Sequence, residues 1–549
     1  MKINRYISIV FAGFLLLHSC EDFLDEPIRG AQELDNYFQN ELECEKFLIG
    51  CYQSILQGDQ YWYINLYYVL TESATDDSWL GQPSEASRDY KEFSLLMVNS
   101  HNTWLYPFWE YMYKSIYQCN IALEGLEGSP VNENNPDLIA RLKAEAKFIR
   151  AYAHFELVKN WEVLPVFDRV YGTNELAGMP VSSQEEVYAF IIQELLEVIE
   201  MLPSTVDSGE KGRITAGAAK SYLAKAYMYT EQWGKAYEYA NDVIEGGQYF
   251  LEPQYGNIWD VKNRNGVESI FEFQTNYDPN YETGNSFPIL TGAEEDDGGW
   301  YYNNPTSHLE NEYLAQNDTI RLRASIIKAN NEATIDQDGV GIAPVYDTDG
   351  ISIAVNSQRI SDQEHSKSMR VNRKFYILPE DRNENYGSQQ RRHIPKNHIL
   401  MRLAEVKLMR AEAMWHMIHA VGGASFSEAD IINGDIHDIR NRVGLPDISS
   451  GGSQLLLDIY RERRMELAME FKRWDEIRRT RHPDDGLPMI YHIMGTQGSF
   501  VLYNTEQNTD YWEKDSPYAE SEPSDKGIDF IPGAEWMPIP ARDLSWLNL

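Results

Sequence analysis

The stretch AAKSYLAKAYMYTEQWGKAYEYANDVIEGGQYFL, residues 218–251, decides the fold. Residues 216–230 are rich in alanine, whose small side chain favours a helix and lets a neighbouring helix approach closely. A turn follows at 232–234. Residues 235–245 then resume the helical pattern until the glycine pair 246–247, which favours the end of a helix. The stretch therefore predicts two helices joined by a tight turn.

Alanines that alternate with large aromatic residues in a helix–turn–helix resemble a tetratricopeptide repeat. The chain has no strict period of about 34 residues, so we expect degenerate and interrupted repeats. Segments 138–159, 187–202, 399–418 and 454–479 also place apolar residues at steps of three and four, the spacing of one buried helix face. The first of these faces contains Leu142, Ala146, Ile149, Ala153 and Leu157. These patterns predict a mainly α fold, a tetratricopeptide-like helical scaffold.

The helical period disappears between about 250 and 398, where Gly, Pro, Asn and Asp cluster. Such clusters indicate turns and short strands rather than packed helices. A loop-rich stretch of this length inside a folded chain is more often functional than idle. We therefore predict one domain, 36–549, that consists of an N-terminal helical part (36–250), a loop-rich ligand-facing insertion (251–398) and a C-terminal helical part with a terminal strap (399–549).

A leader precedes this domain. The uncharged run 7–17 follows a short positive start and is too short to span a hydrocarbon core of about 30 Å as a helix, which is typical of a secretory signal peptide. The run ends in LHSC (17–20), which resembles the lipobox of bacterial lipoproteins, where the cysteine is lipidated. An ordinary signal peptide with an incidental cysteine is the alternative. We predict a lipoprotein signal peptide at 1–19 and an acidic tether at 20–35, lipidated on Cys20.

Charge and cysteine content exclude some classes of partner and of fold. The chain has 48 basic and 85 acidic residues and a formal net charge of −37, so it should repel nucleic acid and anionic lipid surfaces. We therefore predict no nucleic-acid partner. Three cysteines follow Cys20, an odd number that does not describe a disulfide framework. Cys44 and Cys51 are seven residues apart, on one face of an expected helix, and we predict that they are core residues rather than a metal pair.

Several motifs recur in order along the chain. The C-terminal part contains ILMRLAEVKLMRAEAMWH (399–416), IRNRVGLPDI (439–448), IYRERRMELAMEFKRWDEIRRTR (459–481) and EWMPIPARDL (535–544). The N-terminal half contains CEDFLDEP (20–27), ATDDSW (74–79) and AEAKFIRAYAHFELVKNWEVLPVF (144–167), besides the opening stretch. Together these motifs resemble the RagB/SusD family, the outer-membrane glycan-binding lipoproteins of Bacteroidetes, over essentially the whole chain after the leader.

The resemblance implies a tetratricopeptide-like scaffold and lipid-anchored display on the outer membrane, facing the cell surface. It also implies a SusC-like TonB-dependent transporter as partner. The acidic run after Cys20 resembles the surface-export signal of lipoproteins in that phylum.

The 459–481 segment has its own physical interpretation. Glu462, Glu466 and Glu470 lie four residues apart, interleaved with arginines, so a helix here could stabilise itself with pairs four residues apart. The glutamates also remove the positive field that nucleic-acid binding needs. We expect this segment to be part of the fold, with an inward face of Leu456, Ile459, Leu467, Phe471 and Trp474.

Candidate catalytic and metal sites are weak in this sequence. Residues 294–297 are four adjacent acids, and a pair of carboxylates is what glycoside hydrolysis requires, but adjacent acids between glycines are usually a solvated turn. His416 and His419 lie three apart on a helix without the glutamate of a zincin, which favours packing over metal binding. The turns 336–339 and 347–350 match a calcium loop only in part. We predict no enzyme activity, no metal site and no cofactor, with a structural Ca²⁺ as the alternative.

Sugar rings present apolar C–H faces bordered by hydroxyls, so a glycan site needs exposed aromatic rings beside polar side chains. Two loop segments have this composition, one from Asp76 to Arg88 with Asn102 and Trp104 soon after it, the other at 300–304. Residues of comparable regions form the site in glycan-binding members of the RagB/SusD family. The predicted ligand-binding residues are Asp77, Trp79, Arg88, Asn102, Trp104, Trp300, Tyr301 and Tyr302.

The sequence thus predicts a cell-surface lipoprotein that captures oligosaccharides and delivers them to a TonB-dependent transporter without catalysis. Three alternatives stay open. The ligand could be another nutrient such as a peptide, which would favour a groove with exposed backbone edges. The protein could be a glycoside hydrolase on a helical scaffold. It could also be a structural subunit of the transporter that binds no soluble ligand.

Overall fold

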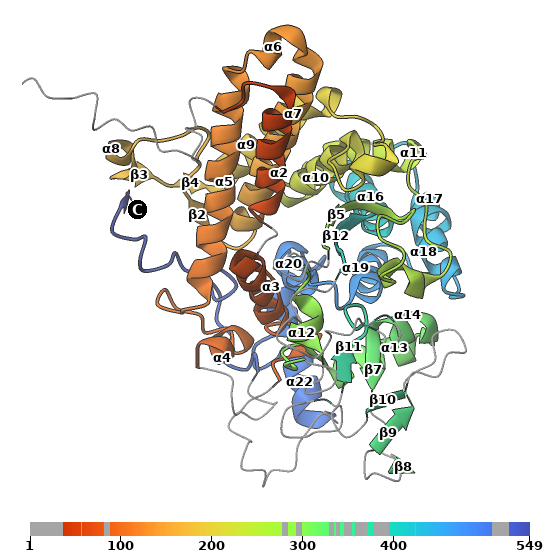
Figure 1. Ribbon diagram of the computed structural model, residues 1–549. Helices are drawn as coiled ribbons and strands as arrows, with labels where there is room; N and C mark the ends of the chain where they lie inside the picture. Colours follow the sequence, from red (N-terminus) through yellow and green to blue (C-terminus); the bar gives the residue numbers. More distant parts are fainter. Residues whose placement is uncertain are drawn as a thin grey trace, which may run out of the picture.

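The computed structural model describes residues 37–548 except 56–57, 82–87, 277–283, 293–298, 329–333, 336–340, 345–353, 357–367, 369, 378–380, 382–394, 423 and 508–525. Helices dominate these residues, and the strands are short and pair in twos and threes (Figure 1). The predicted mainly α fold is confirmed. Within the described part of the chain, no helix is both long enough and apolar enough to cross a membrane.

The opening stretch forms the predicted pair of helices, α10 (Ala216–Tyr229) and α11 (Trp233–Glu245), which pack side by side (Figure 1). The Thr215 side chain accepts a hydrogen bond from the Ala218 amide at 3.2 Å and caps the first helix. Glu231 has a φ of 55°, which lets the chain reverse within a few residues. The second helix begins at Trp233, two residues before the predicted start.

The N-terminal helices form a stack that leads to this pair. Neighbours in the stack pack against each other in the order α2, α5, α7, α9 and α10, with α3 against α5. The apolar face predicted in 138–159 is fully buried in α7. The helices are α2 (Glu41–Gln53), α3 (Gly58–Glu72), α4 (Arg88–Ser94), α5 (Leu105–Glu127), α6 (Val131–Asn134), α7 (Pro136–Val158), α8 (Thr173–Leu176) and α9 (Gln184–Val198).

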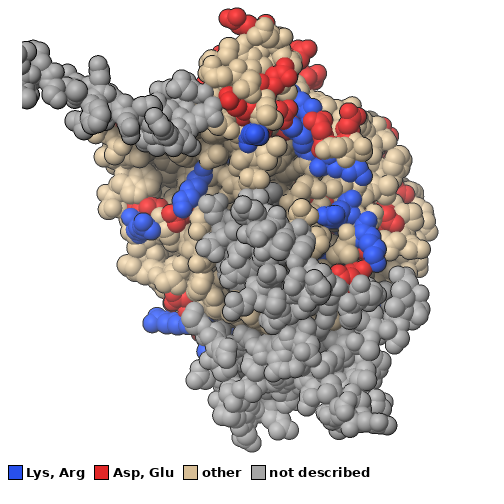
Figure 2. Space-filling model, viewed as in Figure 1, with Lys and Arg blue, Asp and Glu red and all other residues tan. Residues whose placement is uncertain are grey.

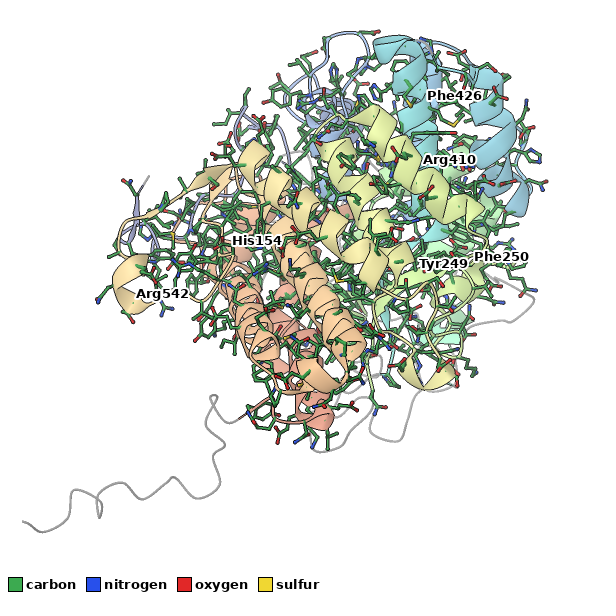
Figure 3. The ribbon with its side chains drawn as sticks, turned by 90° about the horizontal axis from the view of Figure 1, so that it is seen from above. His154, Tyr249, Phe250, Arg410, Phe426 and Arg542 are labelled. Atoms are coloured by element: carbon green, nitrogen blue, oxygen red, sulfur yellow. The ribbon has the colours of Figure 1, made fainter. Side chains whose placement is uncertain are left out.

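The C-terminal helices continue the stack. The segment predicted as helix 399–418 is a strand, β12 (His398–Arg402), followed by α16 (Leu403–His416). Arg410 of α16 donates to Asn241 Oδ1 and Glu245 Oε1 of α11 at 2.8 and 2.9 Å and so joins the two helices (Figure 3). The remaining helices are α17 (Glu428–Ile431), α18 (His437–Arg442), α19 (Ser453–Leu467), α20 (Arg473–Arg479), α21 (Met489–Ile493) and α22 (Ser499–Glu506).

The sequence predicts one helix at 454–479, but the structure has two helices there, α19 and α20. The chain leaves the helix after Leu467, and Met469 and Phe471 take positive φ values of 64° and 58° before α20 begins. The predicted pairing four residues apart is therefore wrong. Glu462, Glu466 and Glu470 instead accept from arginines that are distant in sequence or on other elements, because burial makes such partners necessary. The predicted inward face of Leu456, Ile459, Leu467, Phe471 and Trp474 is buried, as expected.

The region 251–398 contains short strands, as predicted, but also helices that the sequence did not reveal, α12 (Phe287–Thr291), α13 (Ser307–Ala315) and α14 (Thr319–Ser325). The antiparallel pairs are β1 (Ser78–Trp79) with β6 (Asn304–Pro305), β2 (Val163–Leu164) with β4 (Ser182–Ser183), β5 (Ser269–Phe273) with β12, and β7 (Ile326–Lys328) with β11 (Arg370–Asn372). β9 (Gly341–Pro344) lies between β8 (Thr334–Ile335) and β10 (Ala354–Asn356), and β3 (Met179–Pro180) pairs in parallel with β13 (Leu547–Asn548).

The cysteine prediction is confirmed where the structure describes it. Cys44, Cys51 and Cys119 are buried free thiols in the core between α2 and α5. Surface charge is uneven: in Figure 2 acidic side chains gather at the top of the molecule, over α6. The predicted signal peptide, lipidation site Cys20 and tether lie outside the described residues.

Candidate functional site

Asp77 and Trp79 do not lie on the surface. Asp77 has 0 % exposure, and its Oδ1 is 2.6 Å from Nη2 of Arg464. Trp79 is 2 % exposed, and its ring packs 5.6 Å from Phe500 with Lys526 Nζ 4.9 Å from its centroid. The expectation that these two side chains are available in a loop is wrong, because the short strand β1 carries the DDSW motif into the interior against β6.

The neighbouring Asp76 explains this burial. Its carboxylate forms ion pairs with Arg473 Nε at 2.8 Å and with Arg464 Nη2 at 3.0 Å. Burial alone would raise the pKa of Asp76, but the two guanidinium groups outweigh it and hold that pKa well below its usual range. The DDSW motif therefore anchors β1 to α19 and α20, and its acids are structural.

Tyr301 is also buried, with 0 % exposure, and its backbone lies at a φ of 57°. Both neighbours of Tyr301 bond α12 through their backbones. The amides of Trp300 and Tyr302 donate to the Ile289 and Leu290 carbonyls at 2.8 and 2.9 Å. These bonds hold residues 300–302 beside α12, and Trp300 is half-buried.

Six aromatic rings form one continuous row, which we call the aromatic ladder. It begins at Tyr111 of α5, which stacks on Tyr63 of α3 at 5.9 Å, and Tyr63 lies 5.9 Å from Trp104. The ladder then passes from Trp104 to Tyr90 of α4 at 4.9 Å, from Tyr90 to Tyr302 at 5.3 Å, and from Tyr302 to Trp300 at 5.7 Å. Tyr63, Trp104, Tyr111 and Trp300 are half-buried, whereas Tyr90 and Tyr302 are buried.

Asn102 sets the position of Trp104. Its Oδ1 accepts from the Trp104 amide at 3.0 Å, and its Nδ2 donates to the Asp89 carbonyl and to Glu92 Oε2 at 2.8 and 2.9 Å. Asn102 is buried, so it holds the start of α5 against α4. Arg88 pairs with the same Glu92 at 3.4 Å while its side chain is 88 % exposed.

The structure thus divides the predicted residues in two. Trp104, Trp300 and Tyr302 are part of the ladder, Asn102 bonds the Trp104 amide, and Arg88 is in α4 with Tyr90. Asp77, Trp79 and Tyr301 are interior. Sequence reasoning missed Tyr63, Tyr90 and Tyr111. All three lie within aromatic-rich helical segments, and a helical pattern does not tell a core ring from one that lines a site.

The remaining sequence candidates are settled only in part. His416 stacks on Trp233 with centroids 3.8 Å apart and His419 stacks on Trp415 at 4.5 Å, so both imidazoles pack against aromatic rings, as favoured. The acids 294–297 and the aspartates of the turns 336–339 and 347–350 lie outside the described residues.

Comparisons with known proteins agree with this architecture. Residues 22–228 match a family model described as starch-binding, associating with the outer membrane. The "SusD-like protein P2" of Formosa agariphila is 25% identical over 530 residues, which cover 92% of this chain and 95% of that protein.

Solved structures give the same fold. A laminarin-binding SusD-like protein superimposes with a TM-score of 0.68 at 22% identity, covering 93% of this chain and 98% of its own. Surface glycan-binding protein A from Bacteroides thetaiotaomicron, solved with laminarihexaose, superimposes with a TM-score of 0.69 at 18% identity, covering 91% and 97%. Residues 255–546, more than half of the chain, match the model of the SusD family, and the chain therefore belongs to that family.

Proposed function

We propose that the protein captures oligosaccharides on the aromatic ladder. The observation that carries this proposal is the continuity of the ladder: the buried rings of Tyr90 and Tyr302 join half-buried rings at both ends, which can offer faces or edges to separate sugar units. Arg88 belongs to α4, the helix that also carries Tyr90 of the ladder, and its exposed guanidinium can donate to hydroxyl groups. Membership in the SusD family and the fold shared with glycan-binding proteins support the same ligand class.

The proposed ligand role is limited to binding. The carboxylates described near the ladder are engaged: Glu92 bonds Asn99 and Asn102, and Asp89 bonds the Thr103 amide at 3.0 Å. Such acids hold α4 and the start of α5 together. We therefore propose capture without hydrolysis and without a cofactor, since the rings and hydrogen bonds supply the affinity.

Replacing Trp104 or Trp300 with alanine should weaken binding of a recognised oligosaccharide about tenfold or more, because each removes a ring from a different half of the ladder. Isothermal titration calorimetry with a panel of plant, host and microbial glycans, in buffer with EDTA, measures this. Tyr117→Ala is the matched control, since Tyr117 is an aromatic residue of α5 that is 53 % exposed and outside the ladder.

Circular dichroism of each variant separates lost binding from lost folding, and Trp104→Phe should retain most of the affinity. Wild-type affinity in both alanine variants would contradict the ladder as the site. New reducing ends after incubation of the purified protein with its ligand would instead favour the hydrolase, and binding of peptides but not glycans would favour the other nutrient.

We further propose that lipidated Cys20 anchors the protein to the outer membrane, facing the cell surface, where it passes its ligand to a SusC-like TonB-dependent transporter. The lipobox-like LHSC supports the anchor, and the match of residues 22–228 to an outer-membrane-associated family supports the location. Two acyl chains suffice for stable anchoring, whereas the acidic chain itself should not adhere to an anionic surface.

Cys20→Ser should move the protein from the outer-membrane pellet to the soluble fraction in cells that produce it. Immunoblots of both fractions measure the shift, and isolation of the wild-type protein in mild detergent should bring the transporter with it. Unchanged membrane association of Cys20→Ser would contradict the lipid anchor, and Cys51→Ser serves as the control because that thiol is buried.

A further inference from the structure

The chain doubles back between α20 and α21 in a tight turn. The His482 amide donates to the Leu487 carbonyl at 2.8 Å, and the Gly486 amide donates to the His482 carbonyl at 2.8 Å. An antiparallel bridge joins Arg481 to Pro488 at the base of the turn. Gly486 has a φ of 73°, a left-handed conformation that glycine adopts readily. These bonds hold the backbone of 482–487 in one conformation.

Three potential metal ligands meet at this turn. One ligand atom each of His482, Asp485 and His492 lies within 4.8 Å of the other two, and the described residues contain no second group of this kind. His492 comes from α21, and its Nε2 is 3.2 Å from the Asp485 carboxylate. The two imidazole rings lie 4.1 Å apart at an angle of 25°.

The environment favours a cation at this place. Within the described part of the chain, Asp485 pairs with no lysine or arginine, and its partners are His492 and the Leu487 amide, which donates at 2.9 Å. The formal net charge of −37 also makes the chain as a whole attract cations rather than anions.

We propose that His482, Asp485 and His492 bind a divalent transition-metal ion, with Zn²⁺ as the expected occupant. Two imidazole nitrogens and one carboxylate oxygen are a donor set that Zn²⁺ takes, and three protein ligands leave a fourth position for water. Both imidazole side chains are partly exposed, and a bound Zn²⁺ would lie roughly 2.0–2.1 Å from one nitrogen of each ring.

The location gives the ion a neighbouring space. His482, Pro483 and Gly486 also line a cavity of about 580 Å³ between α10, α16 and α20, together with aromatic residues such as Tyr229 and Trp536. The cavity is separate from the aromatic ladder, so this site and glycan capture can be tested independently. Metal binding here would fasten α21 to the turn and to the edge of that cavity.

The test is a Zn²⁺ titration of the untagged full-length protein after removal of metal with EDTA, followed by calorimetry or competition with a chromophoric chelator. We expect one Zn²⁺ per chain, and at least tenfold weaker binding in His482→Ala and in His492→Ala. Asp485→Asn should also weaken binding while preserving the shape of the side chain. His437→Ala is the matched control, because the exposed His437 pairs with Asp447 at 2.8 Å outside this trio.

Melting temperatures measured with and without Zn²⁺ distinguish a loss of metal binding from a folding defect. In EDTA, His482→Ala, Asp485→Asn and His492→Ala should have the melting temperature of the wild type, since the three side chains are partly exposed. Added Zn²⁺ should raise the melting temperature of the wild type and of His437→Ala but not of His482→Ala or His492→Ala. Co²⁺ substitution should give the visible absorption of a tetrahedral site. Wild-type Zn²⁺ affinity in both histidine variants, an equal loss in His437→Ala, or no binding at all would overturn the proposal.

Discussion

Arg402→Met should lower the free energy of unfolding by about 3–5 kcal/mol, because it leaves buried carboxylates without their shared partner. Arg402 is 1 % exposed at the end of β12. Its Nη1 lies 2.7 Å from both Glu268 and Glu466, and its Nη2 lies 2.8 Å from Glu470. Burial alone would raise the pKa of Glu466, but Arg442, Arg402 and Arg321 outweigh it and keep it ionised.

Urea unfolding followed by circular dichroism measures this loss. Arg461→Met is the matched control, since Arg461 pairs with Asp458 at 2.7 Å with its side chain 47% exposed, and such surface pairs contribute about 1 kcal/mol or less. Equal stability of the two variants would show that the buried network does not hold β12 to α19 and to the segment that follows it.

The protein should lose stability steeply as the pH falls from 6.5 towards 3. Burial is the main cause that lowers the pKa of His154, His308 and His398 from 6.5 to about 3. The unfolded chain takes up protons on these imidazoles near pH 6.5, whereas the folded protein does not until about pH 3. The unfolded state therefore binds more protons between these values, so the free energy of unfolding rises with pH in this window. Each imidazole contributes roughly 1.4 kcal/mol per pH unit.

His154 offers the sharpest test of this dependence. It lies inside the N-terminal helices (Figure 3), where Nδ1 is 2.9 Å from the Arg150 carbonyl and Nε2 accepts from the Phe167 amide at 3.4 Å. Protonation of Nε2 would place its hydrogen against the hydrogen of the Phe167 amide, so the folded protein disfavours the charged imidazole. His154→Asn should therefore reduce the slope of unfolding free energy against pH by about one proton between pH 6 and 4. Urea titrations at several pH values measure the slope, and a wild-type slope would contradict the assignment.

Two features of the fold could be predicted from residue patterns because they depend on neighbours in the sequence. The helix pair at 216–245 follows from alanine content, a turn and terminal glycines, and the buried face of α7 follows from apolar spacing. The break between α19 and α20 could not be found in this way. Glu470 lies in this break and pairs with Arg402 of β12 and with Lys374, and no local rule encodes such distant partners.

For the candidate site too, some features could be predicted from the sequence and others only from the tertiary structure. Sequence by itself determined the family and suggested the residue types of the candidate site, because motif order and composition are properties of the chain. Tertiary structure alone decided which aromatic residues share a surface. It buried Trp79 through the ion pairs of Asp76 and Asp77, and it joined Trp104 to Trp300 through Tyr90 and Tyr302. The physical reason is that burial and ring-to-ring contact are set by elements far apart in sequence that pack together only in the folded chain.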